Sequence, residues 1–312
     1  MPHGTETGAK RSNQVLAVEV SPEERASKIP SAETVGAAVS ILQRDGIVVI
    51  KQVVDHEAID ILNAKLTAEV EDMVAQPGTH FNFNKEARNI SQPPPYNPDF
   101  MYDTIWANPW TASVVSAILG PHPIVHYANG NTALKSTERQ TVHADLAFRH
   151  LRFPFGIVAN FYLCDTSPAN GSTEVWIGSH RDTSFEDHVK SADAEGGFSS
   201  IEPELVEARR KLIPPVQPVV QKGDLVLRDT RLWHAGMPNR TDTPRIMLAF
   251  SHSPWWYKNG MKMVLLVAAK PLVEKWKAES GIGYAAEFVE EDEPKPVFKL
   301  GSGSQNAAIV YD

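Results

Sequence analysis

The segment from residue 123 to residue 253 most constrains the fold of this 312-residue chain. Its apolar residues come in short runs of strand length, such as 157–163, 225–227 and 246–250. Gly, Pro, Asn and Asp separate these runs, as they separate strands joined by turns. Short strands at this spacing are typical of an antiparallel sandwich or barrel. We therefore expect a fold that is mainly β.

Helical patterns flank this segment. Residues 33–44 look helical, and the apolar run 46–50 after them reads as a buried strand. Asp55 is placed to cap a second helix, in which apolar residues recur every three or four positions and form one face. Further helices are expected at 110–119 and 203–212.

No Gly/Ser-rich linker or internal repeat divides the chain, which predicts one folded domain over residues 31–312. Residues 1–30 are polar and without periodicity, so we expect a flexible N-terminal tail. Within the domain we distinguish a β core, a lid-like segment, an insertion and a C-terminal extension, at about 123–253, 78–109, 181–216 and 254–312 respectively.

Composition narrows the possible partners. The formal net charge is -8 and no basic run occurs, which disfavours nucleic-acid binding because phosphate contacts need clustered Lys and Arg. No apolar stretch is long enough for a membrane span. The single cysteine, Cys164, and a polar N-terminus without a signal peptide fit a cytoplasmic protein. We therefore expect a small-molecule substrate.

A short motif offers metal ligands. His143 and Asp145 are two residues apart, so in an extended segment their side chains point the same way and can bind one ion. His234, on a distant strand, fits as a third ligand. Two histidines and one carboxylate fill one face of a ferrous ion and leave the other face open, as in non-haem iron oxygenases. A second motif of this kind, at residues 180–182, competes on spacing alone.

Arg245 is a candidate for binding a carboxylate. Arg245 lies eleven residues after His234, on the apolar run 246–250. The open face of such an iron admits dioxygen and a bidentate 2-oxo acid. A 2-oxo diacid also has a distal carboxylate, which the planar fork of an arginine can pair with bidentately.

Three sequence pieces carry a resemblance to a known family. They are Gln140–Asp145, Asn170–His180, and Lys222–Asp229 with its continuation to His234, Asn239 and Arg245. Together they resemble the phytanoyl-CoA dioxygenase family of the iron(II)/2-oxoglutarate-dependent superfamily, over roughly residues 40–253. Within that pattern His180 belongs to a Gly-Ser-His turn, which favours the His143 pair as ligands. Ile177 departs from the pattern, because a proline is usual there.

The resemblance implies a double-stranded β-helix, also called a jelly roll or cupin-like fold, with flanking helices. It implies that His143, Asp145 and His234 bind Fe(II). It also implies that Arg245 binds the distal carboxylate of 2-oxoglutarate with help from Thr173, and that Gln140 donates to the carboxylate beside the keto group.

The activity implied is that of a dioxygenase, which uses O2 and converts 2-oxoglutarate to succinate and CO2. An unactivated C–H of a small molecule would be oxidised by hydroxylation, desaturation, ring formation or rearrangement. The closest pattern is that of fungal enzymes that tailor natural products, which suggests secondary-metabolite biosynthesis and a homodimer. The alternatives are a hydroxylase of acyl-CoA or fatty-acid derivatives and a catalytically dead β-helix that serves as a binding protein.

Candidate substrate residues come from the lid and from the strand ends. Phe81, Asn82, Phe83 and Asn84 alternate on the lid-like segment, and loops on a rigid scaffold often carry specificity. Arg149 and His252 are further candidates, with a solvated strand edge for the arginine and a core position for the histidine as the plainer interpretations.

Overall fold

The computed structural model describes residues 14–146, 148–150, 152–189, 200–257, 260–290 and 298–299. The helices are α1 (Pro22–Ser27), α2 (Ala32–Asp45), α3 (His56–Ala75), α4 (Asp103–Trp106), α5 (Pro109–Leu119), α6 (Pro203–Leu212) and α7 (Lys270–Ser280). Short 3-10 turns are η1 (Pro98–Phe100), η2 (Ser179–Arg181), η3 (Phe185–Asp187) and η4 (Val267–Ala269). The strands are β1 (Ala17–Val18), β2 (Ile47–Ile50), β3 (Asn89–Ser91), β4 (Ile124–Ala133), β5 (Ile157–Tyr162), β6 (Glu174–Val175), β7 (Leu225–Asp229), β8 (His234–Ala235), β9 (Arg245–Ser253), β10 (Lys262–Leu266), β11 (Gly283–Tyr284), β12 (Ala286–Val289) and β13 (Phe298–Lys299).

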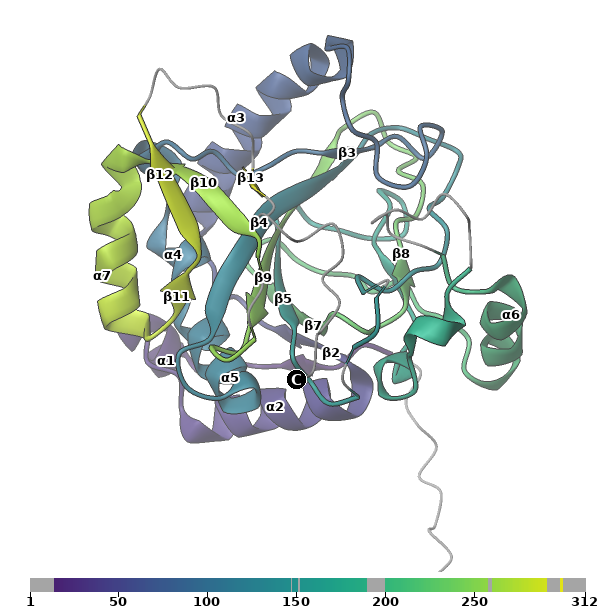
Figure 1. The fold of residues 1–312 in the computed structure, drawn as a ribbon, viewed down its shortest axis with the longest axis horizontal. Helices are drawn as coiled ribbons and strands as arrows, with labels where there is room; N and C mark the ends of the chain where they lie inside the picture. Colours follow the sequence, from purple (N-terminus) through teal and green to yellow (C-terminus); the bar gives the residue numbers. More distant parts are fainter. Residues whose placement is uncertain are drawn as a thin grey trace, which may run out of the picture.

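One large sheet forms the centre of the molecule (Figure 1). Its strand order is β1-β2-β7-β5-β9-β4-β11, with β3 paired to β4, and its central strands are antiparallel. A smaller sheet, β12-β10-β13, lies beside α7, and α6 lies at the opposite end of the molecule. The predicted helices at 33–44, 110–119 and 203–212, and the helix capped by Asp55, are confirmed.

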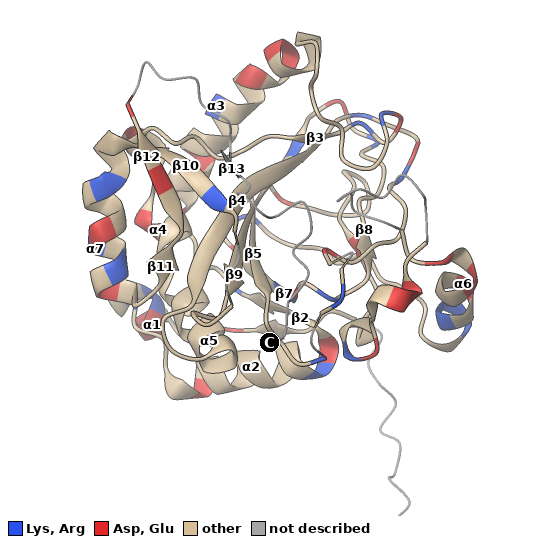
Figure 2. Ribbon diagram, viewed as in Figure 1, with Lys and Arg blue, Asp and Glu red and all other residues tan. Residues whose placement is uncertain are grey.

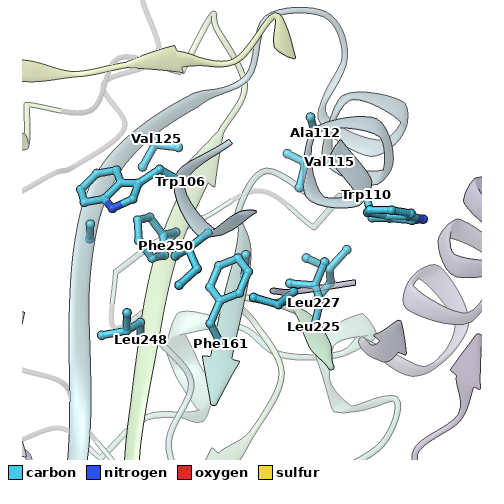
Figure 3. Close-up of a cluster of buried hydrophobic side chains, with 14 of the residues drawn as sticks. Trp106, Trp110, Ala112, Val115, Val125, Phe161, Leu225, Leu227, Leu248 and Phe250 are labelled. Atoms are coloured by element: carbon cyan, nitrogen blue, oxygen red, sulfur yellow. The ribbon is translucent and has the colours of Figure 1, made fainter. Parts of the chain in front are cut away.

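Alternation along the central strands gives the large sheet two different faces. On one face, Phe161 of β5 and Phe250 of β9 pack against Trp106 of α4, with ring centroids 4.9 Å apart for Trp106 and Phe250. Figure 3 shows these rings in one cluster with side chains of α5. This buried face anchors the helices and fixes the register of the sheet, because a one-residue slip would turn the apolar set outward.

The other face of the sheet looks toward a second, shorter layer. There β6 pairs with β8, and isolated bridges join His143 to His234 and Val175 to Val216. A large sheet facing a smaller β layer, with helices outside, is the predicted double-stranded β-helix, and this fold prediction is confirmed. The gap between the layers is where the functional side chains gather.

The prediction of a flexible tail is wrong for residues 14–30. Ala17–Val18 pairs in parallel with β2, and Val20 is 2% exposed. Ser21 caps α1 in a capping box with Glu24, which satisfies backbone N–H groups that a short helix would otherwise expose. Residues 1–13 lie outside the described part of the chain.

Charged residues lie mainly on the periphery. Figure 2 shows them on α3, α6 and α7, whereas β4 and β5 carry none. Among the described residues, no helix is both long enough and apolar enough to span a membrane.

Candidate metal centre and active site

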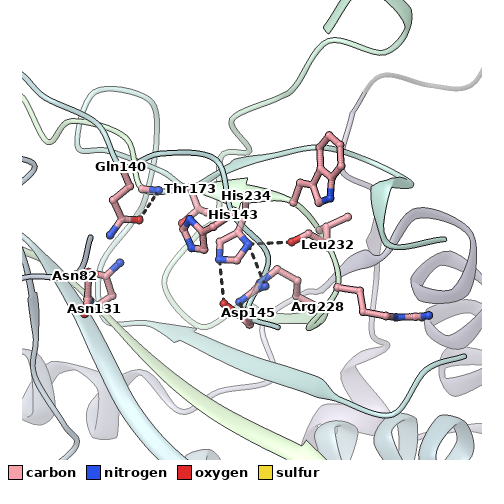
Figure 4. Close-up of polar contacts among 12 residues, drawn as sticks. Asn82, Asn131, Gln140, His143, Asp145, Thr173, Arg228, Leu232 and His234 are labelled. Carbon is pink, nitrogen blue, oxygen red and sulfur yellow. Dashed lines mark hydrogen bonds and ion pairs between the residues drawn. The ribbon is translucent and has the colours of Figure 1, made fainter. Parts of the chain in front are cut away.

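His143, Asp145 and His234 lie together between the two β layers (Figure 4). Each offers one ligand atom, and these atoms are within 4.8 Å of one another. Main-chain bonds tie the residues together: His143 N–H donates to His234 O at 3.0 Å, and His234 N–H donates to His143 O at 2.8 Å. Asp145 N–H donates to Thr230 O at 3.0 Å, which fixes the third side chain relative to the same layer.

Main-chain carbonyls set the tautomer of both histidines. His143 Nδ1 is 2.8 Å from the carbonyl of Thr141, and His234 Nδ1 is 2.9 Å from the carbonyl of Leu232. A carbonyl can only accept, so His143 Nδ1 carries the proton and its Nε2 keeps the lone pair. His234 Nδ1 also lies 3.3 Å from Arg228 Nη1, a donor, and its shorter contact with the Leu232 carbonyl favours the same tautomer. Metal-ligating histidines in proteins are oriented in this way by the groups around them.

Arg228 of β7, which the sequence analysis did not single out, orients the carboxylate. Its Nη2 donates to Asp145 Oδ2 at 2.7 Å, while Asp145 Oδ1 lies 3.4 Å from His234 Nε2. Burial disfavours the charged carboxyl, but the Arg228 guanidinium outweighs burial and holds the pKa of Asp145 well below its usual range. Asp145 is therefore ionised and presents one oxygen beside the two histidines.

Burial also keeps His143 ready to bind a metal. The pKa of the His143 ring is lowered well below its usual value by burial and by the neighbouring His234. A neutral imidazole is the form that donates a lone pair to a cation. Two imidazoles and one carboxylate form a donor set suited to a divalent transition metal.

Arg245 is a fully buried cation at the start of β9. Its Nη2 donates to the carbonyl of Gly171 at 3.0 Å, and its guanidinium lies 5.8 Å from the Tyr162 ring. Its Nε has no hydrogen-bond partner, and none of the ion pairs in the described part of the chain includes Arg245. Burial lowers the pKa of this guanidinium, although it stays protonated. A buried cation of this kind favours an anionic ligand.

Gln140 and Thr173 line the same cavity. Gln140 Oε1 accepts from Gly236 N–H at 2.8 Å, so its Nε2 is the remaining donor, and this atom is buried without a partner. Thr173 Oγ1 is 3.4 Å from the hydroxyl of Tyr162, the residue beside Arg245. Donors therefore stand on both sides of the space next to the metal ligands.

These residues border a cavity of about 460 Å³ between the β layers. Its floor is the open face of the large sheet, and Asn82 and Phe83 of the lid-like segment close part of it. The Phe83 ring lies 3.8 Å, centroid to centroid, from His143. The wall also includes the apolar or aromatic residues Leu146, Phe148, Phe155, Val158, Val226, Met247, Tyr257 and Met261.

The other four predicted substrate residues do not line this cavity. Phe81 packs beside Ile90 and Val70, and the side-chain Oδ1 of Asn84 caps a turn by accepting from Ala87 N–H. The side chain of Arg149 is 79% exposed and pairs with Glu186.

His252 is likewise a core residue. Its Nδ1 lies 3.0 Å from the carbonyl of Phe250, and the ring is buried within the large sheet. The neighbouring His126 does line the cavity. The rival motif at 180–182 is structural too, because His180 Nε2 bonds the carbonyl of Gln43.

Comparison with known proteins agrees with the family resemblance seen in the sequence. Residues 42–247, well over half of the chain, match the family described as phytanoyl-CoA dioxygenase (PhyH). The chain belongs to the phytanoyl-CoA dioxygenase family. The predicted family, and with it the predicted enzyme class of non-haem iron(II)/2-oxoglutarate-dependent dioxygenases, is confirmed.

Several relatives resemble this phytanoyl-CoA dioxygenase family member. The dioxygenase andF of Emericella variicolor is 24% identical over 242 residues, which are 72% of this chain and 76% of that protein. The epimerase SnoN of nogalamycin biosynthesis has a TM-score of 0.51 at 16% identity, over 72% of this chain and 82% of its own. EctD of S. alaskensis with 2-oxoglutarate and 5-hydroxyectoine has a TM-score of 0.54 at 19% identity, over 72% and 76%. These two structures share the fold.

The site fits the cofactors of the phytanoyl-CoA dioxygenase family. Two imidazole Nε2 atoms and one carboxylate oxygen match the ligand set of iron(II) oxygenases. The unpartnered donors of Gln140 and Arg245 match the two carboxylates of 2-oxoglutarate, since an anion would satisfy atoms that the protein leaves without partners.

Proposed function

We propose that this protein is a dioxygenase that binds Fe(II) through His143, Asp145 and His234 and binds 2-oxoglutarate through Arg245, Thr173 and Gln140. The observation that carries this proposal is that the three-ligand cluster and the unpartnered Gln140 Nε2 border one cavity. Arg245, whose Nε also has no partner, lies buried beside Tyr162 of the cavity wall. Iron and 2-oxoglutarate together supply oxidation of a substrate C–H by O2, with release of succinate and CO2.

The protein's own residues have distinct tasks in this proposal. The carbonyls of Thr141 and Leu232 keep both histidine Nε2 atoms unprotonated toward the metal. Arg228 keeps Asp145 ionised and occupies one of its two oxygens. The apolar wall excludes water around the reacting carbon, which protects an oxidising site from side reactions.

We propose that the substrate is a small molecule of secondary metabolism. The epimerase SnoN, from nogalamycin biosynthesis, supports this assignment. The lining supports it too, because it is largely apolar. A coenzyme A thioester would bring several phosphates, yet the charged lining residues described, Asp145 and Arg228, are already paired with each other. The acyl-CoA alternative is therefore less favoured.

A catalytically dead binding protein is the remaining alternative. A barrel that had lost catalysis would have no need to retain three metal ligands and a buried unpaired arginine, since such an arginine is costly without an anion. Purified protein with iron(II), ascorbate and 2-oxoglutarate tests this directly. We expect succinate release that His143→Ala abolishes and that the surface variant His56→Ala retains.

The decisive counter-result concerns 2-oxoglutarate. If the protein bound iron but 2-oxoglutarate failed to bind in equilibrium titration, the proposed function would be wrong.

Two finer parts of the proposal are a cytoplasmic location and a homodimer. Light scattering on the purified protein measures the second, and a monomer at micromolar concentration would contradict it.

A further inference from the structure

Asn160 is a polar residue in the middle of the apolar strand β5. The residue is 3% exposed and lines the cavity, and its Nδ2 has no hydrogen-bond partner. Leaving a buried amide unpaired is costly, because the group has lost its hydrogen bonds to water. Either the strand bears this cost for nothing, or a ligand in the cavity satisfies the amide.

The neighbours of Asn160 on the sheet cannot serve as partners. Val226 of β7 and Ala249 of β9 lie directly beside it in the register. Val158 and Tyr162 precede and follow it on the same face of β5, and both line the cavity. The amide of Asn160 is thus flanked by two apolar side chains across the register and by Tyr162, whose hydroxyl lies 3.4 Å from Thr173 Oγ1.

Two other polar side chains around the cavity, Asn129 and Ser253, already have protein partners. Asn129 donates to Ser91 and Tyr127, at 2.7 and 2.6 Å. The Ser253 hydroxyl lies 3.2 Å from His126 Nδ1. These groups complete the wall, whereas the amide of Asn160 remains for something inside it.

We propose that Asn160 recognises an uncharged oxygen, a carbonyl or a hydroxyl, on a substrate that is otherwise apolar. This rests on the proposed function, because the substrate shares the cavity with the metal ligands. An amide can donate to either oxygen and can also accept from a hydroxyl. A charged group at this position would be poorly matched, because a buried ion needs a counter-charge. The two charged side chains of the cavity, Asp145 and Arg228, already form an ion pair with each other.

Binding of 2-oxoglutarate does not require the amide of Asn160. Arg245 and Gln140 together offer one donor set for each of the two carboxylates of that cosubstrate. Asn160 is therefore assigned to the substrate, and its loss should change substrate selectivity while 2-oxoglutarate affinity stays the same.

Three compounds with one skeleton test the inference: 9-fluorenone, fluorene and fluorene-9-carboxylate. Their dissociation constants would be measured by calorimetry on the full chain loaded with Mn(II) and 2-oxoglutarate, which needs no turnover. We expect the preference for the ketone over the hydrocarbon to fall about five- to tenfold in Asn160→Leu, the ratio that one net hydrogen bond provides. The carboxylate should bind weakest to the wild type.

Matched variants separate recognition from structure. Ser253→Ala removes a wall hydroxyl that already has a protein partner, so it should leave the ketone preference near that of the wild type. Asn160→Leu should be at least as stable as the wild type, because it removes a buried unpaired amide. Asn160→Gln, which retains an amide, should recover part of the preference.

Four results would overturn the inference: an unchanged ketone preference in Asn160→Leu, a carboxylate that binds tightest, no binding of any of the three compounds, or a loss confined to 2-oxoglutarate affinity. Failure of the proposed function is a separate result. It would appear as absent 2-oxoglutarate binding to the Mn(II)-loaded wild type, and the ketone preference would still be measured with Mn(II) alone.

Discussion

Asp145 has two carboxylate oxygens, and each has a different neighbour. Oδ2 accepts from Arg228 at 2.7 Å, and Oδ1 faces His234 Nε2. An ion between the histidines would therefore meet one carboxylate oxygen, because the other is occupied. A carboxylate that binds through one oxygen leaves more of the metal's coordination sphere for small ligands. Arg228 is thus a positioning residue for the metal site.

Removal of the Arg228 guanidinium should weaken metal binding. Loss of a group that orients a ligand typically costs 10- to 100-fold in metal affinity, and we expect Arg228→Met to fall in this range. Mn(II) titration followed by electron paramagnetic resonance measures the effect. Arg149→Met, at an exposed arginine paired with Glu186, is the control and should bind Mn(II) like the wild type. Equal affinity in Arg228→Met would contradict the assigned role.

Arg245 should act on the cosubstrate alone. Arg245→Met removes a buried cation whose expected partner is the distal carboxylate, so 2-oxoglutarate affinity should fall by about tenfold or more. Mn(II) affinity should stay unchanged, because Arg245 contacts none of the metal ligands in the described structure. Calorimetric titration of Mn(II) and then of 2-oxoglutarate separates the two. Parallel losses of both would indicate a folding defect instead.

Sequence reasoning reached residues whose role follows from spacing and missed those whose role follows from packing. His143 and Asp145 lie two apart on an extended segment, so their convergence was predictable. Arg228 was missed because its partner, Asp145, is 83 residues away. One signal was available: Asn160 interrupts an apolar strand, and a residue that breaks a local rule often marks a functional site.

At the level of elements, the sequence predicted strands better than loops. Short apolar runs between turn residues predicted β2, β5, β7 and β9 of the large sheet. The irregular lid-like segment gave no periodicity from which to orient Phe81 or Asn84. The N-terminal segment carried a readable signal, a Ser21-Pro22-Glu23-Glu24 start with a capping box and a proline at the first helical turn. Its neighbouring two-residue strand, β1, is too short for any alternation to appear.

Deletion of residues 1–30 should destabilise the domain, although the sequence suggested a flexible tail. The deletion removes β1 and two valines, Val18 and Val20, that are 8% and 2% exposed. Full burial of one such side chain is worth about 1.5–3 kcal/mol, so we expect a loss of roughly 3–6 kcal/mol in unfolding free energy. Urea denaturation measures it, with deletion of residues 1–13 as the control. Equal stability of the two truncated proteins would show that β1 contributes nothing.

For the molecule as a whole, two buried neutral histidines predict sensitivity to acid. Burial lowers the pKa of His126 and that of His252 to about 4 from the usual 6.5. Both rings lie inside the fold, where a charged form would lose its hydration. In the unfolded chain they would titrate near 6.5, so between pH 6.5 and 4 the unfolded state binds more protons. Stability is therefore complete above pH 6.5 and falls as the pH drops toward 4.

The variant His252→Asn isolates one of these contributions. It keeps an N–H donor for the carbonyl of Phe250 but cannot titrate, so its stability should fall less steeply between pH 6.5 and 4. A shift of 2.5 pH units at about 1.4 kcal/mol each limits the difference to about 3 kcal/mol. Urea denaturation at several pH values measures both curves, and exposed His56→Ala should follow the wild type. Carboxylates titrate alike in all three proteins, so parallel curves for His252→Asn and the wild type would mean that His252 is protonated equally in the folded and unfolded chains.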